Sequence, residues 1–103
     1  MDHQPVRTMY LAYITAKEYP LFRRGLPPDA RLPETYDEWV QQTIDEHATH
    51  RLAGHHTEPV VVRWDDLLKY ADLLGLAPSY SLLTALAVHR GRNQQQPSAR
   101  RVE

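Results

Sequence analysis

The chain has 103 residues, the size of one small domain with a modest core. It contains no cysteine, which excludes disulfides and thiolate zinc sites, and its formal net charge of -1 provides no general attraction to nucleic acid or anionic membranes. No apolar run approaches the ~20 residues that span a bilayer, and the opening residues MDHQPVR lack the apolar core of a signal peptide, which predicts a cytoplasmic protein.

The first predicted element is a strand from Arg7 to Thr15 (RTMYLAYIT), rich in aromatic and β-branched residues. Apolar side chains occupy both of its faces, so both should be covered. The segment from Thr15 to Glu18 has the spacing of a capping box, so a helical turn should follow directly. The proline-rich stretch from Gly25 to Pro33 predicts an irregular loop.

A second capping box, from Thr35 to Glu38, opens the longest predicted helix. This helix should run to about Ala53, with Gly54 as its stop. Its apolar residues recur at helical spacing and are expected to face the core.

A second strand is predicted from Glu58 to Trp64 (EPVVVRW), because three consecutive valines are stiff at χ1 and suit a pleated surface. Alternation along this strand places Val60, Val62 and Trp64 on the core face and Val61 on the other face.

Two short helices are predicted after the second strand. The first has Asp65 as its N-cap and Gly75 as its left-handed C-cap. The second starts at Pro78 and Ser79, ends near Gly91, and is apolar around most of its circumference, as helices are when they are buried on several sides or lie at a subunit interface. The interface candidates on it are Tyr80, Leu82, Leu83, Leu86 and Val88.

These elements predict a small α/β fold of the α+β type, in which a two-stranded sheet packs with about four helices in the order strand, helices, strand, helices. Two strands alone are marginal. Either a third strand is missed, or two chains complete a sheet of about four strands across a two-fold axis. The predicted domain covers residues 1–91, and the polar segment 92–103 is predicted to be a disordered tail.

Four histidines stand near the end of the long helix and in the loop after it. Two histidines at i and i+3 on a helix can share one metal ion, and a loop histidine could complete the site. The alternatives are a cationic side chain favoured by the helix C-terminus and a pH-responsive contact. The candidates are His47, His50, His55 and His56, and no cofactor is predicted.

The helix pair from Leu67 to Arg90 has glycine and alanine spacing that resembles a helix-turn-helix. Its second helix presents leucine, alanine and valine where a recognition helix presents polar and basic side chains, which disfavours DNA binding. The nucleic-acid candidates are Arg90, Arg92, Arg100 and Arg101, for which a solvated surface is the alternative.

The segment from Leu32 to Trp39 (LPETYDEW), taken with Val60–Val62 and the Gly75–Leu76 pair, resembles a group of small uncharacterised bacterial proteins of the kind found among accessory and mobile-element genes. The resembling motifs are capping and packing signals. The resemblance therefore implies no activity and no functional residue.

No catalytic set can be assembled from the motifs, whereas the last helix and the many tyrosines suit an interface. The sequence therefore predicts a non-enzymatic protein-interaction module, a homodimer that binds and modulates or inhibits another macromolecule. Neither membrane association nor a small-molecule substrate is predicted. One alternative is a nucleic-acid-associated regulator that uses the 67–90 helix pair and the arginines. A second alternative is a histidine-rich metal-binding protein.

Overall fold

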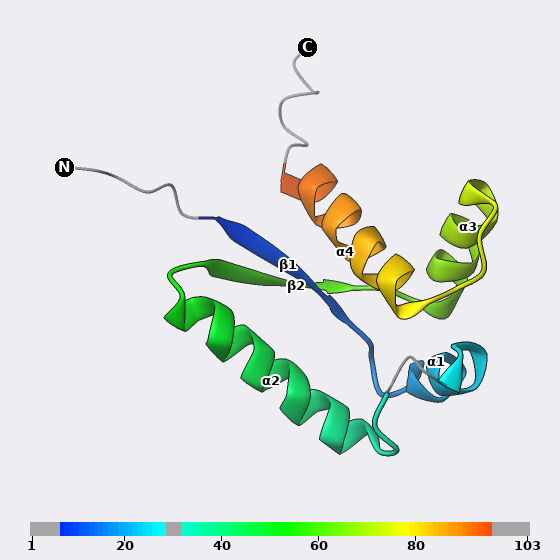
Figure 1. The fold of residues 1–103 in the computed structure, drawn as a ribbon, viewed down its shortest axis with the longest axis horizontal. Helices are drawn as coiled ribbons and strands as arrows, with labels where there is room; N and C mark the ends of the chain where they lie inside the picture. Colours follow the sequence, from blue (N-terminus) through cyan, green and yellow to red (C-terminus); the bar gives the residue numbers. More distant parts are fainter. Residues whose placement is uncertain (1–6, 29–31, 96–103) are drawn as a thin grey trace, which may run out of the picture.

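The predicted fold class is confirmed by the computed structural model, which describes residues 7–28 and 32–95. In this part of the chain a two-stranded sheet is combined with four helices in the order β-α-α-β-α-α (Figure 1). The elements are β1 (Thr8–Tyr13), α1 (Tyr19–Gly25), α2 (Tyr36–Leu52), β2 (His56–Val61), α3 (Trp64–Leu74) and α4 (Tyr80–Gln95).

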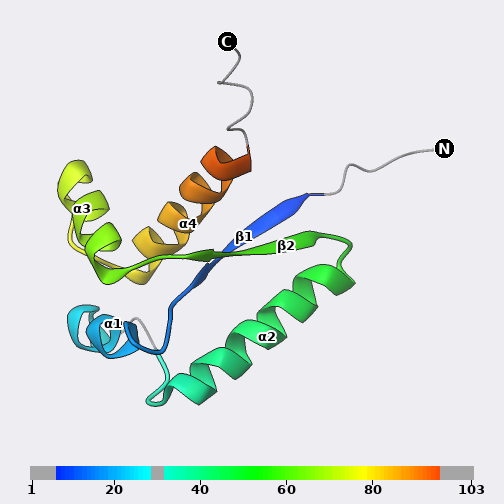
Figure 2. The same cartoon turned by 180° about the vertical axis from the view of Figure 1, so that it is seen from behind.

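The two strands are parallel neighbours, with a register that runs from Thr8 opposite His56 to Tyr13 opposite Val61. Parallel strands need a long crossover connection, which α1 and α2 provide here. The sheet lies between α2 and α4 (Figures 1 and 2). The strands therefore form the middle layer of three.

Both faces of β1 are covered, as its sequence predicts. The Tyr13 ring packs against Trp39 of α2, with ring centroids 5.6 Å apart. On the other face, the Tyr10 ring lies against Gly91 of α4. The core is apolar and is formed by Ile14, Tyr19, Phe22, Leu26, Trp39, Val60, Val62, Leu67, Ala71, Leu82, Leu83, Leu86 and Ala87.

The start of α2 confirms the second capping box. The Glu38 N–H donates to Thr35 Oγ1 at 3.1 Å, and the Thr35 N–H donates to Glu38 Oε1 at 3.3 Å. The helix ends as predicted, with Ala53 as C-cap and Gly54 at a φ of 92°. These signals act within one turn of the helix, so they need no tertiary contact.

The first predicted capping box, at Thr15, is wrong. The Thr15 backbone carbonyl accepts the N–H groups of Glu18 and Tyr19, which makes a turn before α1. The Glu18 side chain does not return a bond to Thr15; its Oε1 accepts the backbone N–H of Trp64 at 2.8 Å. The Glu18 carboxylate therefore bonds to the N-terminus of α3, far along the chain, and not to the backbone of Thr15.

The second strand lies earlier in the chain than predicted, at His56–Val61. The alternation is confirmed, since Val60 is 3% and Val62 0% exposed whereas Val61 is 49% exposed. Trp64 is not a strand residue but the first residue of α3.

The predicted N-cap of α3 is also wrong, because Arg63 and not Asp65 precedes the helix. The Arg63 N–H donates to Asp66 Oδ2 at 3.0 Å, so the carboxylate acts from the third helical position. The C-cap is as predicted, with Gly75 in the left-handed region at a φ of 69°.

Helix α4 continues past its predicted end near Gly91 to Gln95, so residues 92–95 belong to a helix and not to a disordered tail. Residues 96–103 of the predicted tail lie outside the described residues. Within the ranges 7–28 and 32–95, no helix is long and apolar enough to cross a bilayer.

Candidate functional site

The free edge of β1 is the first component of the candidate site. At the ends of the ladder, the His56 N–H donates to the Arg7 carbonyl oxygen at 2.9 Å and the Val62 N–H to the Tyr13 carbonyl oxygen at 3.1 Å. Backbone groups alternate along a strand, so the even-numbered residues of β1 face away from β2. These residues are Thr8, Tyr10 and Ala12. No hydrogen bond among the described residues uses their backbone N–H and C=O groups.

The outer edge of β2 is blocked over its second half. The same alternation directs the backbone of Thr57, Pro59 and Val61 to this edge. The Thr57 backbone has no hydrogen bond among the described residues, but Pro59 has no N–H to donate. The Val61 carbonyl oxygen accepts from the Arg90 guanidinium at 3.2 Å, and Asp66 holds that guanidinium at 3.0 Å. Natural sheets protect exposed edges in this way. Within residues 7–28 and 32–95, the edge of β1 is therefore open along the strand, whereas the edge of β2 is blocked at Pro59 and at the Val61 carbonyl.

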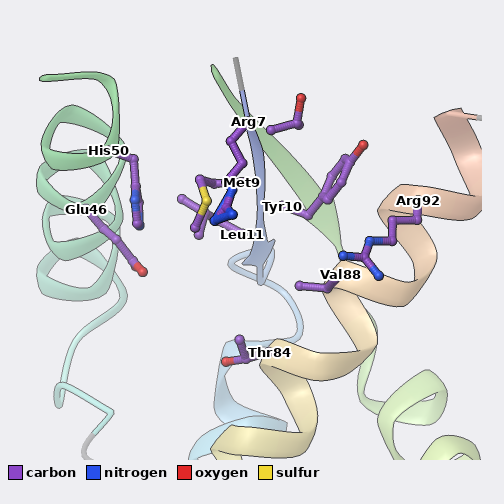
Figure 3. A pocket seen from close by; sticks show the side chains of 10 residues that line it. Arg7, Met9, Tyr10, Leu11, Glu46, His50, Thr84, Val88 and Arg92 are labelled. Atoms are coloured by element: carbon purple, nitrogen blue, oxygen red, sulfur yellow. The ribbon is translucent and has the colours of Figure 1, made fainter. Parts of the chain in front are cut away.

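A groove of about 440 Å³ runs along the free edge of β1, between α2 and α4 (Figure 3). One wall is formed by residues of α2. The other wall is formed by residues of α4 that stand four positions apart, and β1 forms the floor. We call this the β1 groove. Its lining residues are Arg7, Thr8, Met9, Tyr10, Leu11, Glu46, His50, Thr84, Val88 and Arg92.

Helix α4 lies directly on β1 because Gly91 has no side chain. A Cβ at this position would overlap the ring of Tyr10. The contact places Tyr10 and Arg92 together on the α4 side of the groove, while Met9 points toward Glu46 and His50 on the α2 side (Figure 3). The floor therefore presents a different side chain to each wall.

The groove carries both signs of charge. Arg7 and Arg92 contribute guanidinium groups, Glu46 contributes a carboxylate, and His50 adds an imidazole. Such a lining can donate to and accept from a bound chain, in addition to the unpaired backbone groups on the floor. The arrangement is suited to holding an extended polypeptide.

A smaller hollow of about 290 Å³ lies between α2 and the face of the sheet that α2 covers. Burial, and then the neighbouring Arg51 guanidinium, lower the pKa of His47 in this hollow below its ordinary value. The imidazole is thereby biased toward its neutral form. The lining residues are Tyr13, Val40, Thr43, Ile44, His47, Arg51 and Pro59.

Tyr36 ties the start of α2 to the end of β1. Its hydroxyl donates to the Ile14 carbonyl oxygen at 2.8 Å and lies 2.9 Å from the Tyr13 hydroxyl. Burial, reinforced by the Tyr13 hydroxyl, raises the pKa of Tyr36 to about 12. This hydroxyl is therefore protonated at neutral pH and acts as a structural link.

The four candidate metal ligands are not brought together. His47 lines the smaller hollow, His50 lines the β1 groove, and the His50 and His55 ring centroids are 6.3 Å apart. His56 is exposed and lies 2.9 Å from a Glu58 carboxylate oxygen. In the described ranges, no group of three or more His, Asp or Glu side chains could hold a metal ion.

The predicted interface on α4 is largely the core of the single chain. Leu82, Leu83 and Leu86 are 9%, 1% and 6% exposed, so a second chain cannot reach them without opening the domain. Tyr80 is 41% exposed and Val88 is half-buried in the wall of the β1 groove. The apolar circumference of α4 therefore reflects burial against β1, β2 and α3.

The arginine candidates have separate roles. Arg90 is engaged by Asp66 and by the Val61 carbonyl, whereas Arg92 lines the β1 groove. Arg100 and Arg101 lie outside the described residues. Two arginines on one helix, one of them paired, do not form a basic surface of the kind that phosphate recognition uses.

Sequence reasoning missed the floor of the groove, which residues 7–11 form. One signal could have indicated it. The stretch from Met9 to Tyr13 has no proline and no charge, whereas β2 contains both Glu58 and Pro59. Edge-protecting residues on only one strand of a pair indicate which edge is left free.

Comparisons with known proteins add no relative: no family model, no curated protein and no solved structure matches the chain. The resemblance to small bacterial accessory proteins therefore stays a prediction.

Proposed function

We propose that this protein is a non-enzymatic interaction module that binds an extended segment of another polypeptide along the free edge of β1 and thereby modulates that polypeptide. The observation that carries the proposal is the asymmetry of the sheet. The edge of β1 is unpaired in the part of the chain that the structure describes and opens into a groove, whereas Pro59 and Arg90 block the second half of the edge of β2.

An added strand would supply what the sheet lacks. A two-stranded sheet is marginal by itself, and a third strand would pair the outward backbone groups of Thr8, Tyr10 and Ala12. In strand addition, main-chain hydrogen bonds provide affinity and alternate side chains provide specificity. Here the alternate side chains would meet the α2 wall at Glu46 and the α4 wall at Val88.

The test uses a phage-displayed library of random peptides, selected on dilute wild-type protein. We expect the selected peptides to shift the amide NMR signals of Thr8, Tyr10 and Ala12 more than those of Met9 and Leu11, whose N–H groups face β2. We also expect Thr8→Pro to weaken peptide binding by about tenfold, because it removes one outward N–H.

Thr8→Val is the matched control, since it retains the backbone N–H and the shape of the side chain. It should bind the selected peptides as the wild type does. Failure to select any peptide at a protein concentration where light scattering gives the mass of one chain, or peptides that bind the Thr8→Pro variant at full strength, would contradict the proposal.

A further inference from the structure

We infer that the strand that occupies the β1 groove is β1 of a second copy, paired antiparallel across a two-fold axis that passes beside Tyr10. This inference rests on the proposed function, because it names the partner of the same edge. The result is a four-stranded sheet in the order β2-β1-β1-β2, completed by both copies.

The β1 side chains on the α4 side of the sheet form favourable cross-strand pairs about this axis. The outward backbone groups of Thr8, Tyr10 and Ala12 form the hydrogen-bonded pairs of the new ladder. With Tyr10 opposite the partner's Tyr10, Thr8 stands opposite Ala12 of the partner subunit. No like charges face each other in these pairs, and two aromatic rings meet at the centre.

The residues on the α2 side also match. Met9 stands opposite the partner's Leu11, and Arg7 stands opposite the partner's Tyr13. Both are non-hydrogen-bonded pairs, in which side chains approach most closely. One pair is apolar on both sides and the other sets a guanidinium beside an aromatic ring, which is an attractive combination.

The groove walls of one copy are complementary to the same walls of the second copy. Glu46 and His50 stand one helical turn apart on α2, and both face the groove (Figure 3). A two-fold axis places the two α2 helices antiparallel, so Glu46 of one copy approaches His50 of the partner subunit. On α4, Thr84 and Val88 are short side chains that allow the helices to come close. Arg92 of each copy lies beside Tyr10, near the axis, and its side chain is exposed, so the two guanidinium groups must extend into solvent and away from each other.

The blocked edge of β2 explains why such pairing would stop at two copies. A symmetric contact through one edge leaves the two β2 strands at the outside of the four-stranded sheet. Pro59 and Arg90 protect those outer edges from further strands. One open and one blocked edge therefore favour a closed dimer over a fibre.

The test is a cysteine cross-link. Only the introduced cysteines can form a disulfide, because the chain has no cysteine of its own. In a hydrogen-bonded antiparallel pair the Cα atoms are about 5.5 Å apart, within the range that a disulfide spans. We expect the double variant Thr8→Cys/Ala12→Cys to form a covalent dimer under mild oxidation. Each single variant should not, because equal residues two positions from the axis lie roughly 13 Å apart.

Light scattering on the wild type accompanies the cross-link, and we expect the mass of two chains. A monomeric mass with no cross-link would overturn the second copy as occupant, while the peptide selection would still decide the proposed function. A dimeric mass without a cross-link, or cross-linking of either single variant, would place self-association elsewhere or in another register and would overturn the inference as well.

Discussion

The Glu18 carboxylate accepts the backbone N–H of Trp64 at 2.8 Å, across 46 positions of the chain. The second oxygen of the same carboxylate lies 3.9 Å from the Arg63 guanidinium. Glu18 thus precedes α1 and caps the first turn of α3, where the helix dipole favours a negative charge. This bond joins the segments that follow the two strands.

Loss of this cap should destabilise the fold. We expect Glu18→Ala to lower the free energy of unfolding by about 1–2 kcal/mol, because the part-buried Trp64 N–H loses its acceptor. Glu18→Gln keeps an acceptor oxygen and should cost less. Urea unfolding of both variants is the measurement, and equal losses would show that charge and not the hydrogen bond is what matters.

The contact between Gly91 and Tyr10 predicts a second effect. We expect Gly91→Ala to destabilise the protein by about 1–3 kcal/mol, because the added methyl group overlaps the Tyr10 ring. In the Tyr10→Val background the same substitution should cost much less. A double-mutant cycle from thermal unfolding measures the difference, and additive effects would refute the steric explanation.

Asp66 predicts a pH dependence. Its burial tends to raise the pKa, but hydrogen bonds from the Arg90 guanidinium and the Arg63 N–H outweigh burial and hold the pKa below the ordinary 3.8. A carboxyl group with a lowered pKa stabilises the folded state above its unfolded pKa, and this stabilisation is lost as the pH falls.

Stability should therefore drop more between about pH 5 and pH 2 in the wild type than in Asp66→Asn. The difference should be about 1 kcal/mol or less, because both members of the pair are partly exposed to solvent. Denaturant titrations across this range measure it. If stability falls equally with pH in the two proteins, the interaction between the Asp66 carboxylate and Arg90 does not stabilise the folded state.

The protected edge of β2 predicts how assembly could be changed. In Pro59→Thr/Arg90→Ala an N–H is restored and the Val61 carbonyl is released, so both edges of the sheet become available. We expect species larger than a dimer in light scattering as the concentration rises. Pro59→Ala alone is the control, since Arg90 still covers the Val61 carbonyl, and an unchanged mass in the double variant would contradict the role of the block.

The sequence predicted the order of elements well, because the relevant signals are local. The capping box from Thr35 to Glu38 and the glycines at 54 and 75 act within one helical turn. Valine alternation in β2 also needs only the pleat of the strand. These features depend on backbone geometry and near neighbours.

Some assignments failed where two residues could serve the same local purpose. Asp65 and Asp66 both suit the start of α3, and only the position where β2 ends decides that Arg63 precedes the helix and Asp66 accepts its N–H. The box at Thr15 failed because the Glu18 carboxylate finds a better partner in Trp64. Local patterns cannot weigh a partner far along the chain.

The sequence by itself determined the elements, the apolar faces and the exclusion of cysteine chemistry. Tertiary structure alone decided that β1 and β2 are parallel neighbours, that α4 is buried against them, and that Arg90 covers the Val61 carbonyl at the outer edge of β2. It also separated the four histidines between two hollows and the surface. The physical reason is that edge pairing and side-chain convergence depend on the packing of segments distant in the chain, for which a single sequence has no periodic signal.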